Sequence, residues 1–159
     1  MGKTKSIRYW IGAGIVGLSL AAAGGAALAR DYLPLPPEMA GRTYSAGVVT
    51  KGGKTVWLAG VTTLSDEQGK SLLGDTEAQT RFIFREIERN LAKAGGKLED
   101  IVSMTVYLTD ARNGSQFTKV RGELFPKNAP SSSQITVAAL ALPGALVEVS
   151  CIAVIGDEK

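Results

Sequence analysis

Glu148 is the residue of this sequence whose type and surroundings best suit a role in chemistry. It lies within Leu146–Ile155, a stretch otherwise dominated by apolar and β-branched residues. Alternation along a strand places Glu148 on the face opposite Val147 and Val149. A carboxylate in such a stretch requires a partner or a solvated cleft, because burial of an unpaired charge is costly. We therefore expect Glu148 beside a partner, in a solvated cleft or at an exposed edge.

Other reactive side chains give weaker signals. Cys151 alternates onto the apolar face of the same stretch, which favours a buried, unreactive thiol over a nucleophile. Ser131–Ser133 form a cluster of hydroxyl groups, which we interpret as part of a loop because no base accompanies it in the sequence. The chain contains no histidine and one cysteine. Catalysis by Ser-His-Asp or Cys-His groups, histidine-ligated metals and internal disulfides are therefore excluded.

The size and charge of the chain restrict its architecture and its partners. The 159 residues suffice for one domain with a short appendage, and a hydrophobic content of 45% is enough for a packed core. Lys3, Lys5 and Arg8 are the charged residues that precede Arg30, and the remainder of the chain has 15 basic and 15 acidic residues. A neutral body argues against a nucleic-acid partner, which would be held largely through phosphate charge.

The amino-terminal segment is predicted to be a separate unit. Trp10–Ala29 is a run of 20 residues without a charge, long enough to cross the core of a bilayer. Residues 1–29 fit a cleaved signal peptide that ends in an Ala-Leu-Ala sequence, and they fit equally well an uncleaved membrane anchor. The basic residues before the run place the body outside the cytoplasm in both cases, as a periplasmic, secreted or inner-membrane-anchored protein. Prolines then predict an extended linker over residues 30–38.

The spacing of apolar residues in the body, residues 39–156, predicts an α+β domain. Its order is strand, strand, helix, strand, helix, strand, strand, with the helices on one side of a largely antiparallel sheet. The expected strands are residues 44–50, 55–59, 102–108, 135–140 and 146–155. The expected helices follow the capping residues Asp75 and Ser115, and they end before Gly95 and Pro126.

Several short sequence motifs, taken together with their order and spacing, make the body similar to the RidA/YjgF family of reactive-intermediate deaminases. The similarity extends from about Met39 to Val154. The motifs are Tyr44-Ser45-Ala46-Gly47, Val56-Trp57-Leu58-Ala59-Gly60, the helix from Gln79 to Asn90, Asp100-Ile101-Val102, Val106-Tyr107-Leu108-Thr109-Asp110 and Leu146-Val147-Glu148-Val149. The resemblance implies a chorismate-mutase-like fold and a homotrimer, with clefts between subunits that bind small carboxylates. It also implies hydrolysis of enamines and imines without a cofactor or a metal.

The resemblance assigns individual residues to the cleft. Tyr44 stands where the family has its cleft tyrosine, and Gly60 stands where a backbone amide touches the ligand. Glu148 matches the position of the family's glutamate, which orients the attacking water. Each has a plainer interpretation: Tyr44 as an aromatic residue packed on the sheet, Gly60 as a turn glycine, and Glu148 as an edge residue.

The sequence also departs from the family at the cleft. Ser132 replaces the arginine that grips the substrate carboxylate, and Thr118 replaces an asparagine. Ala59 and Val61 replace the polar residues on either side of the cleft glycine. A serine hydroxyl cannot form a charged bidentate contact with a carboxylate. We therefore expect a less polar cleft that lacks its cation. Arg42 and Arg121 are the arginines nearby in the sequence, but spacing alone does not place either of them in the cleft.

Three functions follow from these observations. The first is a divergent family member that binds a small metabolite between subunits and lacks the standard deaminase activity on 2-imino acids. The second is an enamine or imine deaminase, or a related hydrolase, that uses Glu148 to activate water. The third is a membrane-anchored structural or accessory subunit, with a protein partner in a membrane complex, which the apolar segment favours.

Overall fold

The computed structural model describes residues 29–156. The predicted signal or anchor, apart from its last residue, lies outside this range. The strands are β1 (Ala29–Leu33), β2 (Gly47–Lys51), β3 (Lys54–Val61), β4 (Ile101–Leu108), β5 (Ser131–Thr136) and β6 (Val147–Ile155). The helices are α1 (Thr76–Ala92) and α2 (Gly114–Leu124), with short 3-10 helices at Pro37–Met39, Leu98–Asp100 and Ala111–Asn113.

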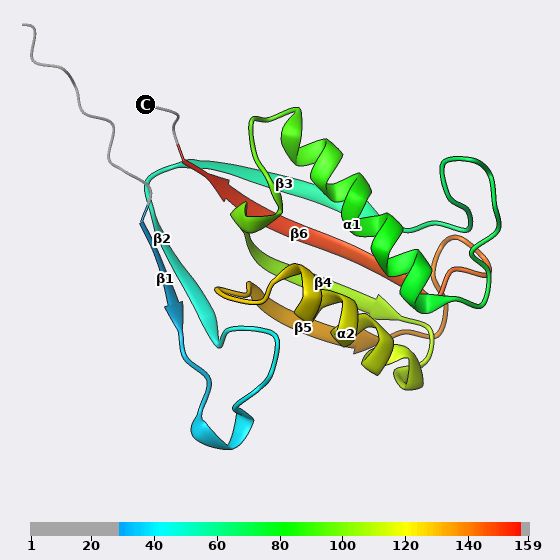
Figure 1. The fold of residues 1–159 in the computed structure, drawn as a ribbon, viewed down its shortest axis with the longest axis horizontal. Coiled ribbons are helices and arrows are strands. Elements are labelled where there is room, and N and C mark those ends of the chain that lie inside the picture. Colours follow the sequence, from blue (N-terminus) through cyan, green and yellow to red (C-terminus); the bar gives the residue numbers. More distant parts are fainter. Residues whose placement is uncertain (1–28, 157–159) are drawn as a thin grey trace, which may run out of the picture.

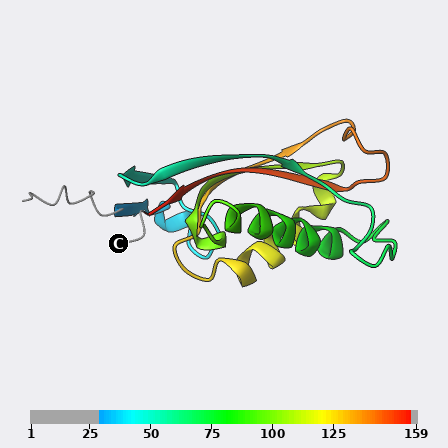
Figure 2. The ribbon, with the colours of Figure 1, turned by 90° about the horizontal axis from the view of Figure 1, so that it is seen from above.

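A four-stranded sheet in the order β3-β6-β4-β5 is the centre of the fold (Figure 1). β6 pairs antiparallel with both β3 and β4, whereas β4 and β5 are parallel. Figure 2 shows α1 and α2 together on one side of this sheet. The predicted α+β architecture is therefore confirmed, with helices on one face of a largely antiparallel sheet.

The core lies between the sheet and the two helices. Alternation along most of β4 and β6 directs residues such as Val106 and Val149 towards the helices, where they are fully buried. Phe84 of α1 packs against Phe117 of α2, with ring centroids 6.1 Å apart. The α1 amino terminus begins where predicted, because the Asp75 side chain accepts a hydrogen bond from the backbone N–H of Ala78 at 2.9 Å.

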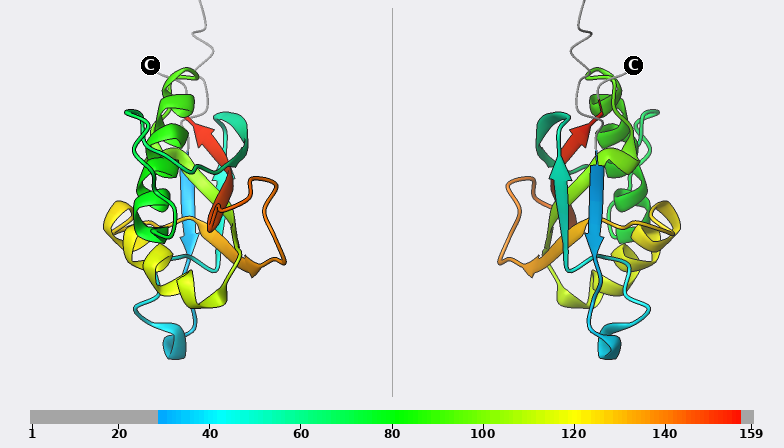
Figure 3. Two further views of the ribbon diagram at one scale, coloured as in Figure 1. Left: turned by 90° about the vertical axis from the view of Figure 1, so that its right-hand side faces the viewer. Right: turned by 90° about the vertical axis from the view of Figure 1, so that its left-hand side faces the viewer.

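The strand before β6 lies earlier in the sequence than predicted. The expectation placed it at residues 135–140 and left Ser131–Ser133 in a loop, but β5 begins at Ser131. Serine is a weak strand former, yet β5 pairs residue by residue with β4, from Ser103↔Ser131 to Leu108↔Thr136. Residues 137–146 form the connection to β6, which Figure 3 shows (orange) projecting on the side of the sheet away from α1.

The segment expected as a linker at residues 30–38 contains a strand. β1 pairs antiparallel with β2, from Ala29↔Lys51 to Leu33↔Gly47. Arg30 of β1 also forms an ion pair with Asp100 at 2.5 Å. These contacts attach the segment to the body, which proline spacing alone did not indicate.

The face of the sheet turned away from the helices exposes a large aromatic side chain. Trp57 of β3 is 76% exposed there, beside its register partner Ile152 of β6. A shallow depression on the same face is lined in part by Ser103, Thr105 and Ser150. Within residues 29–156, no helix has the length and apolar character needed to span a membrane.

Candidate functional site

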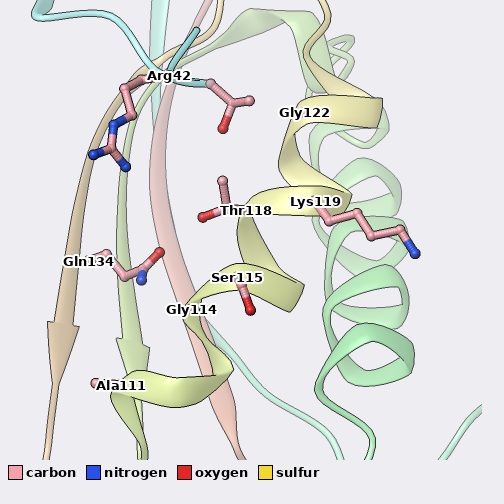
Figure 4. A pocket seen from close by; sticks show the side chains of 9 residues that line it. Arg42, Ala111, Gly114, Ser115, Thr118, Lys119, Gly122 and Gln134 are labelled. Atoms are coloured by element: carbon pink, nitrogen blue, oxygen red, sulfur yellow. The ribbon is translucent and has the colours of Figure 1, made fainter. Parts of the chain in front are cut away.

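An open hollow of about 660 Å³ lies between α2, β5 and the segment that precedes β2. Figure 4 shows side chains from these three elements around it. Its lining combines small and hydroxyl-bearing residues with two cations: Arg42, Thr43, Ala111, Gly114, Ser115, Thr118, Lys119, Gly122 and Gln134. No carboxylate is among these lining residues, so the hollow has a positive character.

The hollow exists because three segments meet closely at this point. Ser45 forms an isolated parallel bridge with Ser131, and its hydroxyl donates to the carbonyl oxygen of Ala129 at 2.6 Å, so the segment before β2 runs beside β5. On the other side, a Cβ at Gly122 would lie 2.9 Å from Cγ2 of Thr43. Glycine at this position lets α2 approach Thr43 closely.

The two cations of the hollow have different surroundings. The ammonium group of Lys119 is 3.0 Å from a carboxylate oxygen of Glu77, and Figure 4 shows this side chain pointing away from the hollow. Arg42 is exposed and takes part in none of the ion pairs found within residues 29–156. Its guanidinium extends along β5 towards Gln134 (Figure 4). Of the two cations that line the hollow, Arg42 is therefore the one without an ion pair among residues 29–156.

Arg121 of α2 is a buried cation directly behind the hollow, with only 4% of the residue exposed. Its Nε donates to Oγ1 of Thr43 at 3.0 Å, and its Nη1 donates to Oγ of Ser132 at 2.7 Å. The guanidinium lies 5.4 Å from the ring centroids of both Tyr44 and Phe117. Burial lowers the pKa of Arg121, but an arginine side chain keeps its charge in proteins.

These contacts correct the expectation that the surroundings of Ser132 lack a cation. The Ser132 hydroxyl is the acceptor for the Arg121 guanidinium, and Tyr44 stacks against the same group. Thr118, the remaining predicted residue of this region, lines the hollow. Sequence spacing could not place Arg121 here, because its contact with Ser132 joins α2 to β5 and depends on how the helix packs.

Glu148 and Gly60 form a second group of predicted site residues. Glu148 of β6 is half-buried, faces away from the core and pairs in register with Tyr107 of β4. A Cβ at Gly60 would lie 2.9 Å from Cδ of Glu148, so only glycine leaves room for this carboxylate. The pairing of β3 with β6 shifts register between Leu58 and Val61, which bends the strand at this point.

Within one chain, the two groups lie on opposite faces of the sheet. Ser132 pairs with Met104, which is buried under the helices. Glu148 pairs with Tyr107, three residues further along β4 and hence on the other face. A single chain therefore does not bring Glu148 and Ser132 into one cavity.

Two features of the hollow were missed by sequence reasoning. Gln134 lies on the same face of β5 as Ser132, two residues further on, and could have been found if the strand had been placed correctly. Thr43 has no local signal, since it lies outside any repeating pattern. The prediction for Cys151 agrees with the structure: the thiol is buried, and burial raises its pKa to about 12. Residues 29–156 contain no cluster of acidic and cysteine side chains suited to a metal ion.

Comparison with known proteins assigns this chain to a family. The family model described as endoribonuclease L-PSP matches residues 37–155. The chain is 31% identical over 104 residues to the 3-aminoacrylate deaminase RutC of Acinetobacter baylyi, covering 65% of this chain and 82% of that protein. It is also 31% identical over 110 residues to a RutC family protein of Pyrococcus abyssi, covering 69% of this chain and 84% of that protein.

Solved structures agree with these relatives. The Rid-family protein YyfB from Yersinia pestis superimposes with a TM-score of 0.66 at 26% identity, covering 79% of this chain and 98% of that chain. Rv2704 from Mycobacterium tuberculosis, a member of the YjgF/YER057c/UK114 family, superimposes with a TM-score of 0.57 at 33% identity. The match covers 80% of this chain and 100% of that chain. The chain belongs to the RidA/YjgF family.

Proposed function

We propose that the protein binds a small metabolite in clefts between the subunits of a homotrimer. Each cleft combines the hollow of one copy, with Thr118 and the Ser132 region, and the Glu148–Gly60 group of a second copy. The observation that carries this proposal is that the two groups lie on opposite faces of one sheet. A second copy is the simplest way to bring such groups together around one ligand.

The exposed sheet face supports the association of copies. Trp57 is 76% exposed and lies next to Ile152 on a face that neither helix covers. A large exposed aromatic side chain is typical of a surface that is buried in an assembly. Light scattering on the full-length protein should give the mass of three chains, and a stable monomer at micromolar concentration would contradict the trimer.

The contacts of Ser132 favour binding over the standard deaminase reaction on 2-imino acids. The position that carries the family's arginine holds a hydroxyl, which already accepts a hydrogen bond from Arg121. A ligand therefore cannot receive a bidentate charged contact from that strand. We expect little clearance of small imino acids generated in place by an amino-acid oxidase.

An enamine or imine deaminase, or a related hydrolase, is the second candidate. The Glu148 carboxylate takes part in none of the ion pairs found within residues 29–156, and it lies beside the backbone of Gly60. A free carboxylate next to a ligand can orient or activate water. The relative from Acinetobacter baylyi, named 3-aminoacrylate deaminase, supports this alternative.

Imine clearance separates the two candidates. The rate should be measured for the wild type, for Glu148→Gln and for the control Glu88→Gln, which changes an exposed glutamate on α1. Clearance by the wild type that is lost in Glu148→Gln and kept in Glu88→Gln would establish the enzyme. Clearance that is absent from all three, together with ligand binding by the wild type, would establish the binding protein.

We also propose that the body lies outside the cytoplasm, in the periplasm or on the outer side of the inner membrane. This proposal depends on the charge pattern around Trp10–Ala29 and not on the fold. A membrane-anchored accessory subunit, the third candidate, depends on the same segment. A reporter fused after Lys159 should be active only outside the cytoplasm, and cytoplasmic activity would contradict the topology.

A further inference from the structure

Two glycine turns flanked by lysines lie side by side at one end of the body. The turn between β2 and β3 is formed by two glycines, both with positive φ, and a second pair of glycines follows α1. The Nζ atom of Lys54 donates to the carbonyl oxygen of Ala94 at 2.6 Å, which joins the two turns. The four lysines that flank the turns are exposed, and we call them the basic end: Lys51, Lys54, Lys93 and Lys97.

The charges of the basic end are not neutralised by carboxylates. Its four lysines take part in none of the ion pairs found within residues 29–156. Lys54 and Lys93 donate hydrogen bonds, but the acceptors are the neutral oxygens of Ala94 and Asn90. Ammonium groups held in this way keep their attraction for an anionic partner.

Acidic residues reduce the charge of this end without cancelling it. The Asp100 carboxylate is already paired with Arg30. The exposed acidic side chains of the neighbouring segments are Asp31 and Glu99, and Lys127 lines the same cavity as Glu99. After β6 the sequence continues with two acidic residues and a lysine. A positive excess therefore remains at the basic end.

The uncharged run Trp10–Ala29 meets the body at the basic end. Ala29 is both the last residue of that run and the first residue of β1. Its register partner in β2 is Lys51, and paired residues of neighbouring antiparallel strands lie about 5 Å apart. Figure 1 shows the start of β1, the turn between β2 and β3 and the end of β6 at the same end of the molecule. The run therefore joins the basic end directly.

From this arrangement we infer that the basic end contacts the phosphate-bearing headgroups of an anionic membrane when Trp10–Ala29 is inserted. The inference rests on the membrane-anchored topology proposed above, and it adds the surface that faces the bilayer and the lipid class. A lysine near an anionic bilayer surface strengthens binding by about fivefold. The ammonium group is a point charge on a flexible stem, so it needs no fixed geometry to meet a headgroup.

Amine labelling of the full-length protein in lipid nanodiscs tests the inference. One set of nanodiscs contains phosphatidylcholine alone, and the other contains an equal mixture of phosphatidylcholine and phosphatidylglycerol. Mass spectrometry of peptides gives the labelling rate of each lysine. The lysines of the basic end should react several-fold more slowly in the anionic nanodiscs, and high salt should remove the difference, because it screens the attraction.

Lys70 is the internal control for this measurement. It is exposed in the loop before α1, whereas Lys93 lies at the opposite end of that helix. Lys70 should therefore react at the same rate in both sets of nanodiscs. Because any assembly of copies is present in both sets, burial between copies cancels in the comparison.

A double variant tests whether the lysines act through their joint charge. Lys51→Gln/Lys97→Gln leaves the hydrogen bonds of Lys54 and Lys93 in place. In this variant, Lys54 and Lys93 should lose most of their protection in the anionic nanodiscs, because half of the attracting charge is gone. The matched control Lys70→Gln should keep the protection.

Each other outcome counts against a specific claim. A full-length protein that neither set of nanodiscs retains would contradict the membrane anchor itself, and with it this inference. Retention with equal labelling of the basic end in both sets, or protection that extends to Lys70, would overturn the basic end as the contact surface and leave the anchor intact. Inorganic phosphate that gives the same protection in detergent without lipid would show a site for free phosphate, and would overturn the membrane as its partner.

Discussion

The Nη1 atom of Arg121 on α2 donates a hydrogen bond of 2.7 Å to Oγ of Ser132 on β5. This contact places a guanidinium from the helix beside Ser132, the strand position at which the family resemblance implies an arginine. The replacement is not equivalent, because the Arg121 group is buried and turned towards Thr43 and Ser132 instead of open solvent. A positive charge is therefore present next to Ser132, but on a buried side chain that comes from the helix.

Ser132→Arg should destabilise the protein, although the family resemblance implies an arginine at this position. The new guanidinium would enter next to that of Arg121, and two like charges at about 4 Å repel by up to about 4 kcal/mol in a partly buried setting. We expect the free energy of unfolding to fall by about 1–4 kcal/mol in chemical denaturation. The double variant Ser132→Arg/Arg121→Met should recover most of the loss. Equal stabilities of the two variants would contradict the repulsion.

Arg121→Met should cost little stability, less than about 1 kcal/mol in the free energy of unfolding. The methionine fills a similar space between Tyr44 and Phe117, and the change removes a buried charge that has no carboxylate partner. Arg121→Lys should be worse, by about 1–2 kcal/mol, because an ammonium keeps the desolvation cost and cannot reach both hydroxyls. Thermal unfolding of the two variants gives this order, and the reverse order would show that the hydrogen bonds dominate.

The sheet and helices were largely predictable, whereas the cleft was not. The alternation of β4 and the cap at Asp75 are local patterns, so the sequence reveals them. β5 lacks such a pattern because Ser131–Ser133 resemble a loop, and its position is determined by pairing with β4. The cation beside Ser132 was missed for a related reason: Arg121 lies on α2 and Ser132 on β5, and local spacing cannot relate the two elements.

Acid should weaken the turn that precedes α2. The carboxylate of Asp110 accepts hydrogen bonds from the side chain and backbone N–H of Arg112, and these hold its pKa at about 2. Since this pKa is below the ordinary value of 3.8, the contribution is complete above about pH 4 and is lost as the pH falls towards 2. Asp110→Asn should therefore lower stability at pH 7, come close to the wild type near pH 2, and so flatten the dependence of stability on pH in that window. An unchanged slope between pH 4 and pH 2 would contradict the assignment.

Gly60→Ala should move the Glu148 carboxylate without removing its charge, and so tests whether its position matters for function. The added methyl group would lie 2.9 Å from Cδ of Glu148 and closer still to the carboxylate oxygen, so the side chain must rotate away. Glu148 is only half-buried, and rotation towards solvent should limit the loss of stability to about 1–2 kcal/mol.

Ligand binding or imine clearance should fall at least tenfold in Gly60→Ala, as in Glu148→Gln, because the displaced carboxylate no longer faces the ligand. Ala59→Gly, which removes a methyl group at the adjacent position, is the matched control and should keep function. Full function in Gly60→Ala, with an unchanged fold by circular dichroism, would show that Glu148 does not act from the position seen here.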